Sequence, residues 1–74
     1  MTCYVVHKVP RGGHKIHHVE YGEVMTLLQK LKRRRIEASV YDTKPFIHND
    51  RIGSIDYLGC QSPKERWRVW LDVR

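Results

Sequence analysis

The middle of the chain contains four apolar residues at helical spacing. They are Val24, Leu27, Leu28 and Leu31. At positions i, i+3, i+4 and i+7 they form one stripe on a helix of about 3.6 residues per turn. The pattern predicts a helix that begins near Glu23, with basic residues in its last turn. Continuing the count returns Arg35 to the apolar stripe, so the helix either ends near Arg34 or carries Arg35 as a side chain that extends outward.

Segments with period-two alternation or β-branched residues flank this helix on both sides. They cover residues 2–9, 36–43, 51–58 and 66–74, and residues 14–19 are compatible with either a further strand or a loop. Turn-forming residues separate them at positions 10–13, 43–45, 48–50 and 59–64. Gly53 interrupts its strand, which indicates a bulge or the close approach of another backbone.

The resulting order of elements, β-(β)-α-β-β-β, predicts the fold class. One amphipathic helix would pack on a mainly antiparallel sheet of three to five strands, as a single two-layer α+β domain over residues 1–74. A chain of 74 residues is too short to divide into two units that each bury a core. The predicted core is Val5, Val24, Leu27, Leu28, Leu31, Val40, Ile55, Trp67, Val69 and Leu71.

Positive charge is in excess, with 14 Lys and Arg against 8 Asp and Glu, for a formal net charge of +6. Such an excess attracts nucleic acid, acidic proteins or anionic lipid, although it also keeps a small domain in solution. Because the basic residues are clustered, we expect a polyanionic or acidic partner. No apolar run could span a membrane, and no signal sequence follows Met1. We therefore expect a complete cytoplasmic protein with Cys3 and Cys60 reduced.

The longest basic run lies at the end of the predicted helix. It comprises Lys30, Lys32, Arg33, Arg34 and Arg35. On a helix, Lys30, Arg33 and Arg34 cluster away from the apolar stripe, where they are placed for phosphate contacts. The alternative is a solvated helix end whose cations match the helix dipole, although four consecutive basic residues exceed what the dipole requires.

Alternation is most regular in the last strand. Its apolar face holds Trp67, Val69, Leu71 and Val73, and its other face holds Arg66, Arg68, Trp70, Asp72 and Arg74. An aromatic ring among arginines is typical of protein-interface hot spots and of surfaces that stack single-stranded nucleic acid. The predicted binding residues on this strand are Arg66, Arg68, Trp70 and Arg74. The alternative is that the N-terminal loop covers Trp70 and forms a second small core.

Histidines are frequent in this short chain. They are His7, His14, His17, His18 and His48. The spacing His14-x-x-His17-His18 matches part of a metal-ligand pattern, but no paired Cys or His arm accompanies it, and the two cysteines are far apart. We therefore predict no metal and no cofactor. His17 and His18 could instead extend a basic surface with Arg11 and Lys15.

Catalysis would need a convergent set of residues that the sequence does not single out. Cleavage of RNA could use His17 or His18 as base, Tyr21 or Tyr57 as donor, and Arg11 or Arg68 beside the phosphate. No spacing selects such a set, no motif flanks either cysteine, and no phosphate-binding glycine motif is present. We therefore predict a non-catalytic protein.

Two functions remain open on the sequence alone. The first is a binding module whose basic and aromatic surface contacts nucleic acid or a nucleoprotein complex, with affinity that falls steeply as salt rises. The alternative is a small inhibitor or adaptor, of the kind phages and mobile elements carry, that docks on a host nuclease or polymerase complex. Such a protein would bind naked nucleic acid weakly. A homodimer through a free sheet edge is compatible with both.

Overall fold

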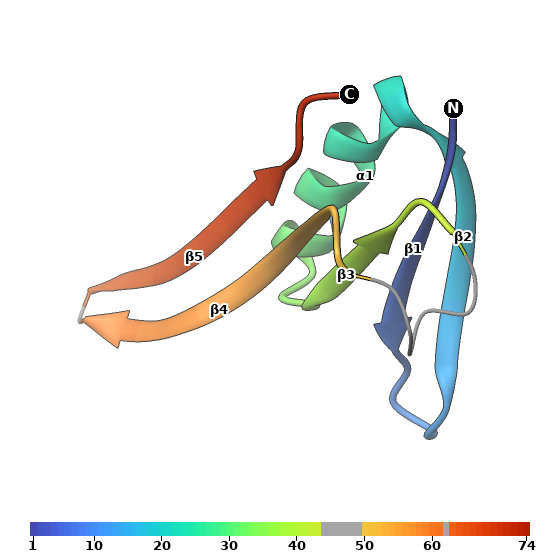
Figure 1. Cartoon of the computed structure of the whole chain (residues 1–74). Helices are drawn as coiled ribbons and strands as arrows, with labels where there is room; N and C mark the ends of the chain where they lie inside the picture. The colour runs from blue at the N-terminus through green and yellow to red at the C-terminus, as the bar shows by residue number, and fades with distance from the viewer. Residues whose placement is uncertain (44–49, 62) are drawn as a thin grey trace.

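The computed structural model describes residues 1–43, 50–61 and 63–74, and it consists of one helix packed on a five-stranded antiparallel sheet (Figure 1). The elements are β1 (Thr2–Lys8), β2 (His14–Glu20), α1 (Tyr21–Arg33), β3 (Ala38–Tyr41), β4 (Gly53–Gln61) and β5 (Lys64–Leu71). Their order across the sheet is β2-β1-β3-β4-β5. The predicted α+β class is confirmed, and the ambiguous residues after the first turn form a strand. The predicted turn positions 44, 45, 48, 49 and 62 lie outside the described residues.

Strand alternation divides the sheet residues between a helix side and a helix-free face. On β1, Cys3, Val5 and His7 are buried on the helix side. The register continues this side across the sheet, because Val5 lies opposite His17 of β2 and Val40 of β3. The helix side therefore contains the core at its centre and two histidines toward one edge.

The helix-free face carries the intervening residues of each strand. One row crosses all five strands and consists of Ile16, Val6, Ser39, Ser54 and Trp70. Trp70 thus belongs to this face, while its chain neighbours Val69 and Leu71 pack against the core under α1. The predicted alternation of the last strand is confirmed up to Leu71, where β5 ends.

The helix ends differ slightly from the prediction. α1 begins at Tyr21 and not at Glu23, because β2 continues directly into it and the Tyr21 N–H donates to the carbonyl oxygen of the first residue (2.8 Å). At the other end, Arg35 has a left-handed backbone (φ 58°) and the Ile36 N–H donates to the Leu31 carbonyl (2.9 Å). This left-handed closure ends the helix before Arg35, in agreement with the prediction.

Most of the predicted core is buried. Among the described residues, the buried apolar side chains are Cys3, Val5, Val24, Leu28, Leu31, Ala38, Val40, Ile52 and Ile55. The other predicted core residues, Leu27, Trp67, Val69 and Leu71, are half-buried against this cluster. Three of them lie on β5, where an edge strand is covered on one flank only. Cys3, Ala38 and Ile52 belong to the core without having been predicted there.

Gly53 lies where β4 meets β5 with no room for a side chain. A Cβ at this position would stand 2.8 Å from the Leu71 Cδ1 and 2.8 Å from the Trp70 carbonyl oxygen. The sequence expectation of a close approach is therefore confirmed, and the break in register lies further along, between Tyr57 and Gly59. Because one of these contacts is backbone, the collision cannot be relieved by a rotamer change.

We expect Gly53→Ala to lower the free energy of unfolding by about 1–3 kcal/mol, the usual cost of overpacking. Gly22→Ala is the matched control, because a Cβ there meets nothing within 4 Å in a helix, where alanine stabilises by up to about 1 kcal/mol. Urea denaturation followed by circular dichroism measures both. Equal urea midpoints for Gly53→Ala and the unmodified chain would show that β4 and β5 can move apart to accept the methyl group without loss of stability.

Two further features limit the chemistry of the molecule. In the described part of the chain, no helix is long and apolar enough to cross a lipid bilayer. Cys3 is buried and Cys60 is exposed, and both are free thiols. Burial raises the pKa of the Cys3 thiol, so this group remains protonated at neutral pH and acts as a small apolar side chain.

Candidate nucleic-acid interface

The predicted binding residues do not form one surface. Arg66, Arg68 and Trp70 alternate with half-buried residues of β5 that pack under α1, which places them on the helix-free face. The basic residues of α1 lie on the other side of the sheet. The sequence predicted both groups, and the structure separates them by the thickness of the sheet.

A hollow of about 370 Å³ lies between the C-terminal half of α1 and the helix side of β1 and β2. Its lining residues are His7, Lys15, His17, Leu27, Lys30, Leu31, Arg33, Arg34 and Ile36. We call it the basic groove. Four of these side chains carry full positive charges, and none of the described lining residues is a carboxylate. The groove therefore brings Lys15 of β2 to the three predicted cations of α1.

These four cations are uncompensated by the described part of the chain. Within residues 1–43, 50–61 and 63–74, neither Lys15 nor Lys30, Arg33 or Arg34 has a carboxylate within 4.0 Å. All four are exposed. Cations this close together repel one another, so the groove attracts an anion strongly and holds its own structure better when one is bound.

His7 and His17 form a hydrogen-bonded pair at the base of this groove. The His7 Nδ1 lies 2.9 Å from the Lys8 carbonyl oxygen, which only accepts, so Nδ1 carries the proton. In the neutral pair, the His7 Nε2 then accepts a hydrogen bond from the His17 Nε2 at 2.9 Å. The two rings are stacked, with centroids 5.0 Å apart.

The environment of His17 favours its neutral form. Burial lowers its pKa most, and the neighbouring charges of His7 and Lys15 lower it further. At neutral pH the groove therefore contains four cations and an uncharged His17. The positive charge of the groove can still increase, because the second ring nitrogen of His17, Nδ1, can accept a proton without breaking the hydrogen bond to His7.

The helix-free face is more nearly neutral around Trp70. Asp56 accepts hydrogen bonds from the Ser54 hydroxyl (2.7 Å) and the Arg68 guanidinium (3.0 Å), and Arg51 lies 3.6 Å away. Burial raises the pKa of Asp56, but these hydrogen bonds and charges outweigh it, so the pKa lies below its usual value. Arg68 is thus paired with a carboxylate, whereas Arg66 has no carboxylate within 4.0 Å among the described residues.

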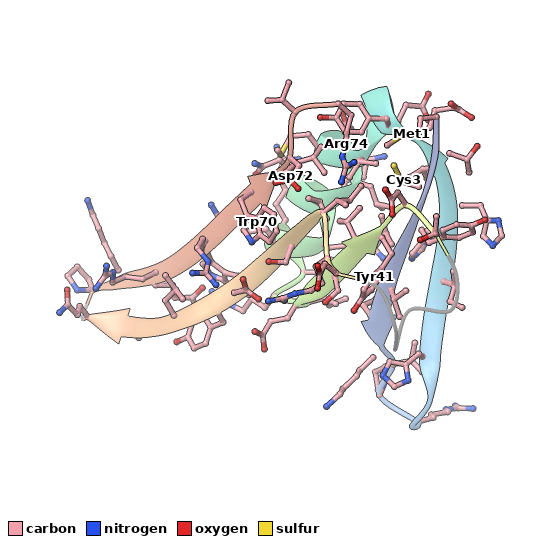
Figure 2. All side chains as sticks on the ribbon, in the orientation of Figure 1. Met1, Cys3, Tyr41, Trp70, Asp72 and Arg74 are labelled. Atoms are coloured by element: carbon pink, nitrogen blue, oxygen red, sulfur yellow. The ribbon has the colours of Figure 1, made fainter. Side chains whose placement is uncertain are left out.

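Arg35 and Arg74 are also paired with acidic side chains. The Arg35 Nε donates to Glu65 at 2.8 Å. Arg74 lies beyond the end of β5, with its guanidinium 3.6 Å from Asp42 and 3.8 Å from Asp72 (Figure 2). The charge of each is balanced locally. Both remain predicted binding residues, with less free charge than the α1 cations.

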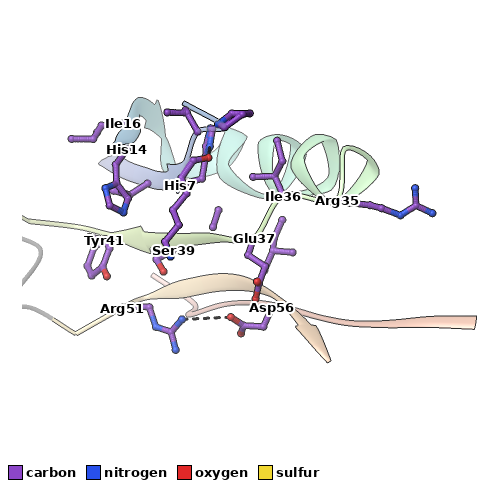
Figure 3. Close-up of a pocket in the computed structure, with 16 residues that line it drawn as sticks. His7, His14, Ile16, Arg35, Ile36, Glu37, Ser39, Tyr41, Arg51 and Asp56 are labelled. Carbon is purple, nitrogen blue, oxygen red and sulfur yellow. Dashed lines mark hydrogen bonds and ion pairs between the residues drawn. The ribbon is translucent and has the colours of Figure 1, made fainter. Parts of the chain in front are cut away.

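A larger cleft of about 910 Å³ lies beside β3, where this short strand leaves β1 and β4 partly uncovered (Figure 3). Lys8, Arg35 and Arg51 line it together with Glu37 and Asp56, and Arg51 is paired with Asp56. Since charges of both signs meet there, the cleft offers no selectivity for a polyanion.

The histidine motif does not converge on one point. Alternation along β2 places His14 and His18 on the helix-free face and His17 on the helix side. In the described ranges, no group of three or more His, Cys, Asp or Glu side chains could hold a metal ion. The possible ribonuclease residues are also dispersed. The Tyr21 hydroxyl donates to the Asp72 carbonyl, and Tyr57 is separated from β2 by two strands.

Comparison of the chain with protein-family models, curated proteins and solved structures gives no match. Sequence reasoning identified Lys30, Arg33 and Arg34, and it suggested that His17 could extend a basic surface together with Lys15. Only the pairing of β1 with β2 brings these two residues beside α1.

Proposed function

We propose that this is a non-catalytic protein that binds nucleic acid, with the phosphate backbone lying in the basic groove. The observation that carries the proposal is the presence of four uncompensated cations around one hollow with no carboxylate among its described lining residues. Phosphates neutralise such cations and release their own counterions, which supplies affinity without any need for base recognition. Both cysteines are free thiols, which suits a protein that works in the reducing cytoplasm.

The test is a titration of labelled single-stranded RNA, single-stranded DNA and duplex DNA at about 50 and 200 mM salt. Four phosphate contacts predict a slope of log K against log salt of about −3 to −4. Affinity should therefore fall roughly 60-fold to 250-fold between the two salt concentrations. No binding to any of the three at the lower salt, or binding that salt leaves unchanged, would refute the proposal.

The pH dependence of this binding has a predicted sign. The titratable and charged groups that face His17 in the groove are His7, Lys15, Lys30, Arg33 and Arg34. Burial lowers the pKa of His17 most, and the charges of His7 and Lys15 lower it further. A bound phosphate offsets this charge contribution, so binding takes up a proton. We expect affinity to rise severalfold between about pH 7.5 and pH 5.5.

His17→Gln should abolish this rise, whereas His18→Gln, on the helix-free face, should retain it. The effect on folding has the opposite sign. The pKa of His17 is lower in the folded chain than its ordinary value of 6.5, so its stabilising contribution is full above that pH and is lost as the pH falls. Affinity that is flat with pH in the unmodified protein would exclude His17 from the site.

The second candidate function is a protein inhibitor or adaptor, and the Trp70 surface favours it. There Asp56 fixes Arg68 beside a half-buried tryptophan, an arrangement of aromatic and paired charge that is common at the centre of protein interfaces. This function predicts no salt-dependent binding of naked nucleic acid. The titration above therefore separates the two functions. A homodimer through the edge strands β2 or β5 is compatible with either.

A further inference from the structure

A second hollow adjoins the basic groove and shares Arg33 with it. It has a volume of about 420 Å³, lies between α1 and β5, and is lined by Gln29, Lys32, Arg33, Arg35, Glu65 and Trp67. The sequence assigned Trp67 to the core. In the structure it is only half-buried, because it lies on an edge strand. An indole ring is therefore accessible next to the cations of α1, on the side of the sheet opposite Trp70.

The ring of Trp67 is held in place by its neighbours. Its Nε1 donates to the Glu65 Oε2 at 3.3 Å, and Arg35 anchors the other carboxylate oxygen at 2.8 Å. The ring of Tyr57 lies with its centroid 5.1 Å away at 60°, and Tyr57 itself is 43% exposed. These contacts fix the orientation of the indole before any ligand arrives, so binding requires little ordering.

The charges around Trp67 suit a nucleotide. Glu65 is already paired with Arg35. Lys32 and Arg33 have no carboxylate within 4.0 Å in the part of the chain that the structure describes, so they can attract a phosphate. A nucleobase is flat and uncharged, and each of the bases can stack on a tryptophan ring, whatever the nucleotide sequence. Arg33 lines both hollows, so a phosphate beside it has the basic groove on one side and the indole on the other.

We infer that the hollow at Trp67 receives an unpaired base of a single-stranded nucleic acid, stacked on the indole, while the adjoining phosphates lie in the basic groove. This inference rests on the proposed function and names the ligand class of the same site. A duplex could not use the hollow, since its bases are stacked on one another and present only their edges. Duplex DNA would then make the phosphate contacts alone.

The test compares two single strands that differ only in their bases. The ligands are an oligothymidylate of about ten nucleotides and an abasic oligomer of the same length. We expect the unmodified protein to bind the oligothymidylate roughly fivefold to a hundredfold more tightly, the range that one stacked base provides. Trp67→Leu, which keeps an apolar contact with the core, should remove this preference and leave the abasic affinity unchanged. Trp70→Leu is the matched control and should retain the preference.

A second measurement does not depend on whether the Trp67→Leu variant folds. The chain has two tryptophans, so Trp70→Phe leaves Trp67 as the sole indole fluorophore. Its fluorescence should be quenched by the oligothymidylate and not by the abasic oligomer. In Trp67→Phe, the remaining signal from Trp70 should stay constant. Quenching of Trp70 with no change at Trp67 would overturn the inference.

The outcomes distinguish this inference from the function on which it rests. Equal, salt-dependent binding of the two oligomers would overturn the stacking site and leave phosphate binding in the groove intact. Failure of both oligomers to bind at low salt would overturn the proposed function together with the inference.

Discussion

The triple substitution Lys30→Ala, Arg33→Ala and Arg34→Ala is expected to lower affinity for nucleic acid about a hundredfold at low salt. Each exposed charge-assisted contact to a phosphate contributes on the order of 1 kcal/mol after screening, and three are lost together. The salt slope should also become shallower by about three, one for each phosphate contact removed. Fluorescence anisotropy with a labelled single strand measures both quantities.

A control of equal charge separates the groove from the net charge. Arg11→Ala, Lys64→Ala and Arg66→Ala together remove the same three charges from exposed positions outside the groove. This control also removes one of the arginines predicted on β5. It should reduce affinity severalfold at most, through the weaker overall field. Equal losses in the two triple variants would mean that the groove has no special role.

The largest effect on stability is expected for Leu28→Ala. Leu28 is fully buried at the centre of the helix stripe, and truncating such a residue costs about 2–5 kcal/mol. Domains of this size lie near the lower end of the usual range of about 5–15 kcal/mol. The variant should therefore be largely unfolded in low concentrations of urea.

Met25→Ala provides the comparison on the same helix. Met25 is 38% exposed, and surface changes of this kind usually stay within about 0.5 kcal/mol. Circular dichroism during a urea titration reports both midpoints. If the Leu28 and Met25 variants unfolded at the same midpoint, the assignment of the helix stripe to the core would be wrong.

Local patterns in the sequence determine most of this fold. The stripe that includes Leu28 predicted the helix, and alternation predicted which residues of β5 face it. Both predictions depend on which face of a single helix or strand is apolar, and the spacing of apolar residues along the sequence indicates that face directly. Gly53 was recognised for the same reason, since a glycine inside a strand indicates a close approach. The helix start at Tyr21 was missed because its first hydrogen bond goes to Met1, a partner twenty positions away in the chain.

The candidate site depends on pairings that no local pattern records. Lys15 and His17 reach the cations of α1 only through the register between β1 and β2. Trp67 has the parity of a core residue, yet it remains accessible because β5 is an edge strand. The order of the strands depends on the whole sheet and not on any one segment. The sequence therefore indicated which residue types would bind a polyanion, but it did not indicate which of these residues would lie side by side.

The most direct test of the central claim is to map the bound ligand by backbone amide chemical shifts in an isotope-labelled sample. With a saturating single strand at low salt, we predict the largest changes at Lys15, His17 and residues 30–34, which surround the basic groove. Changes concentrated at Arg66, Arg68 and Trp70 on the helix-free face of β5, or no changes at all, would contradict the placement of nucleic acid in the groove.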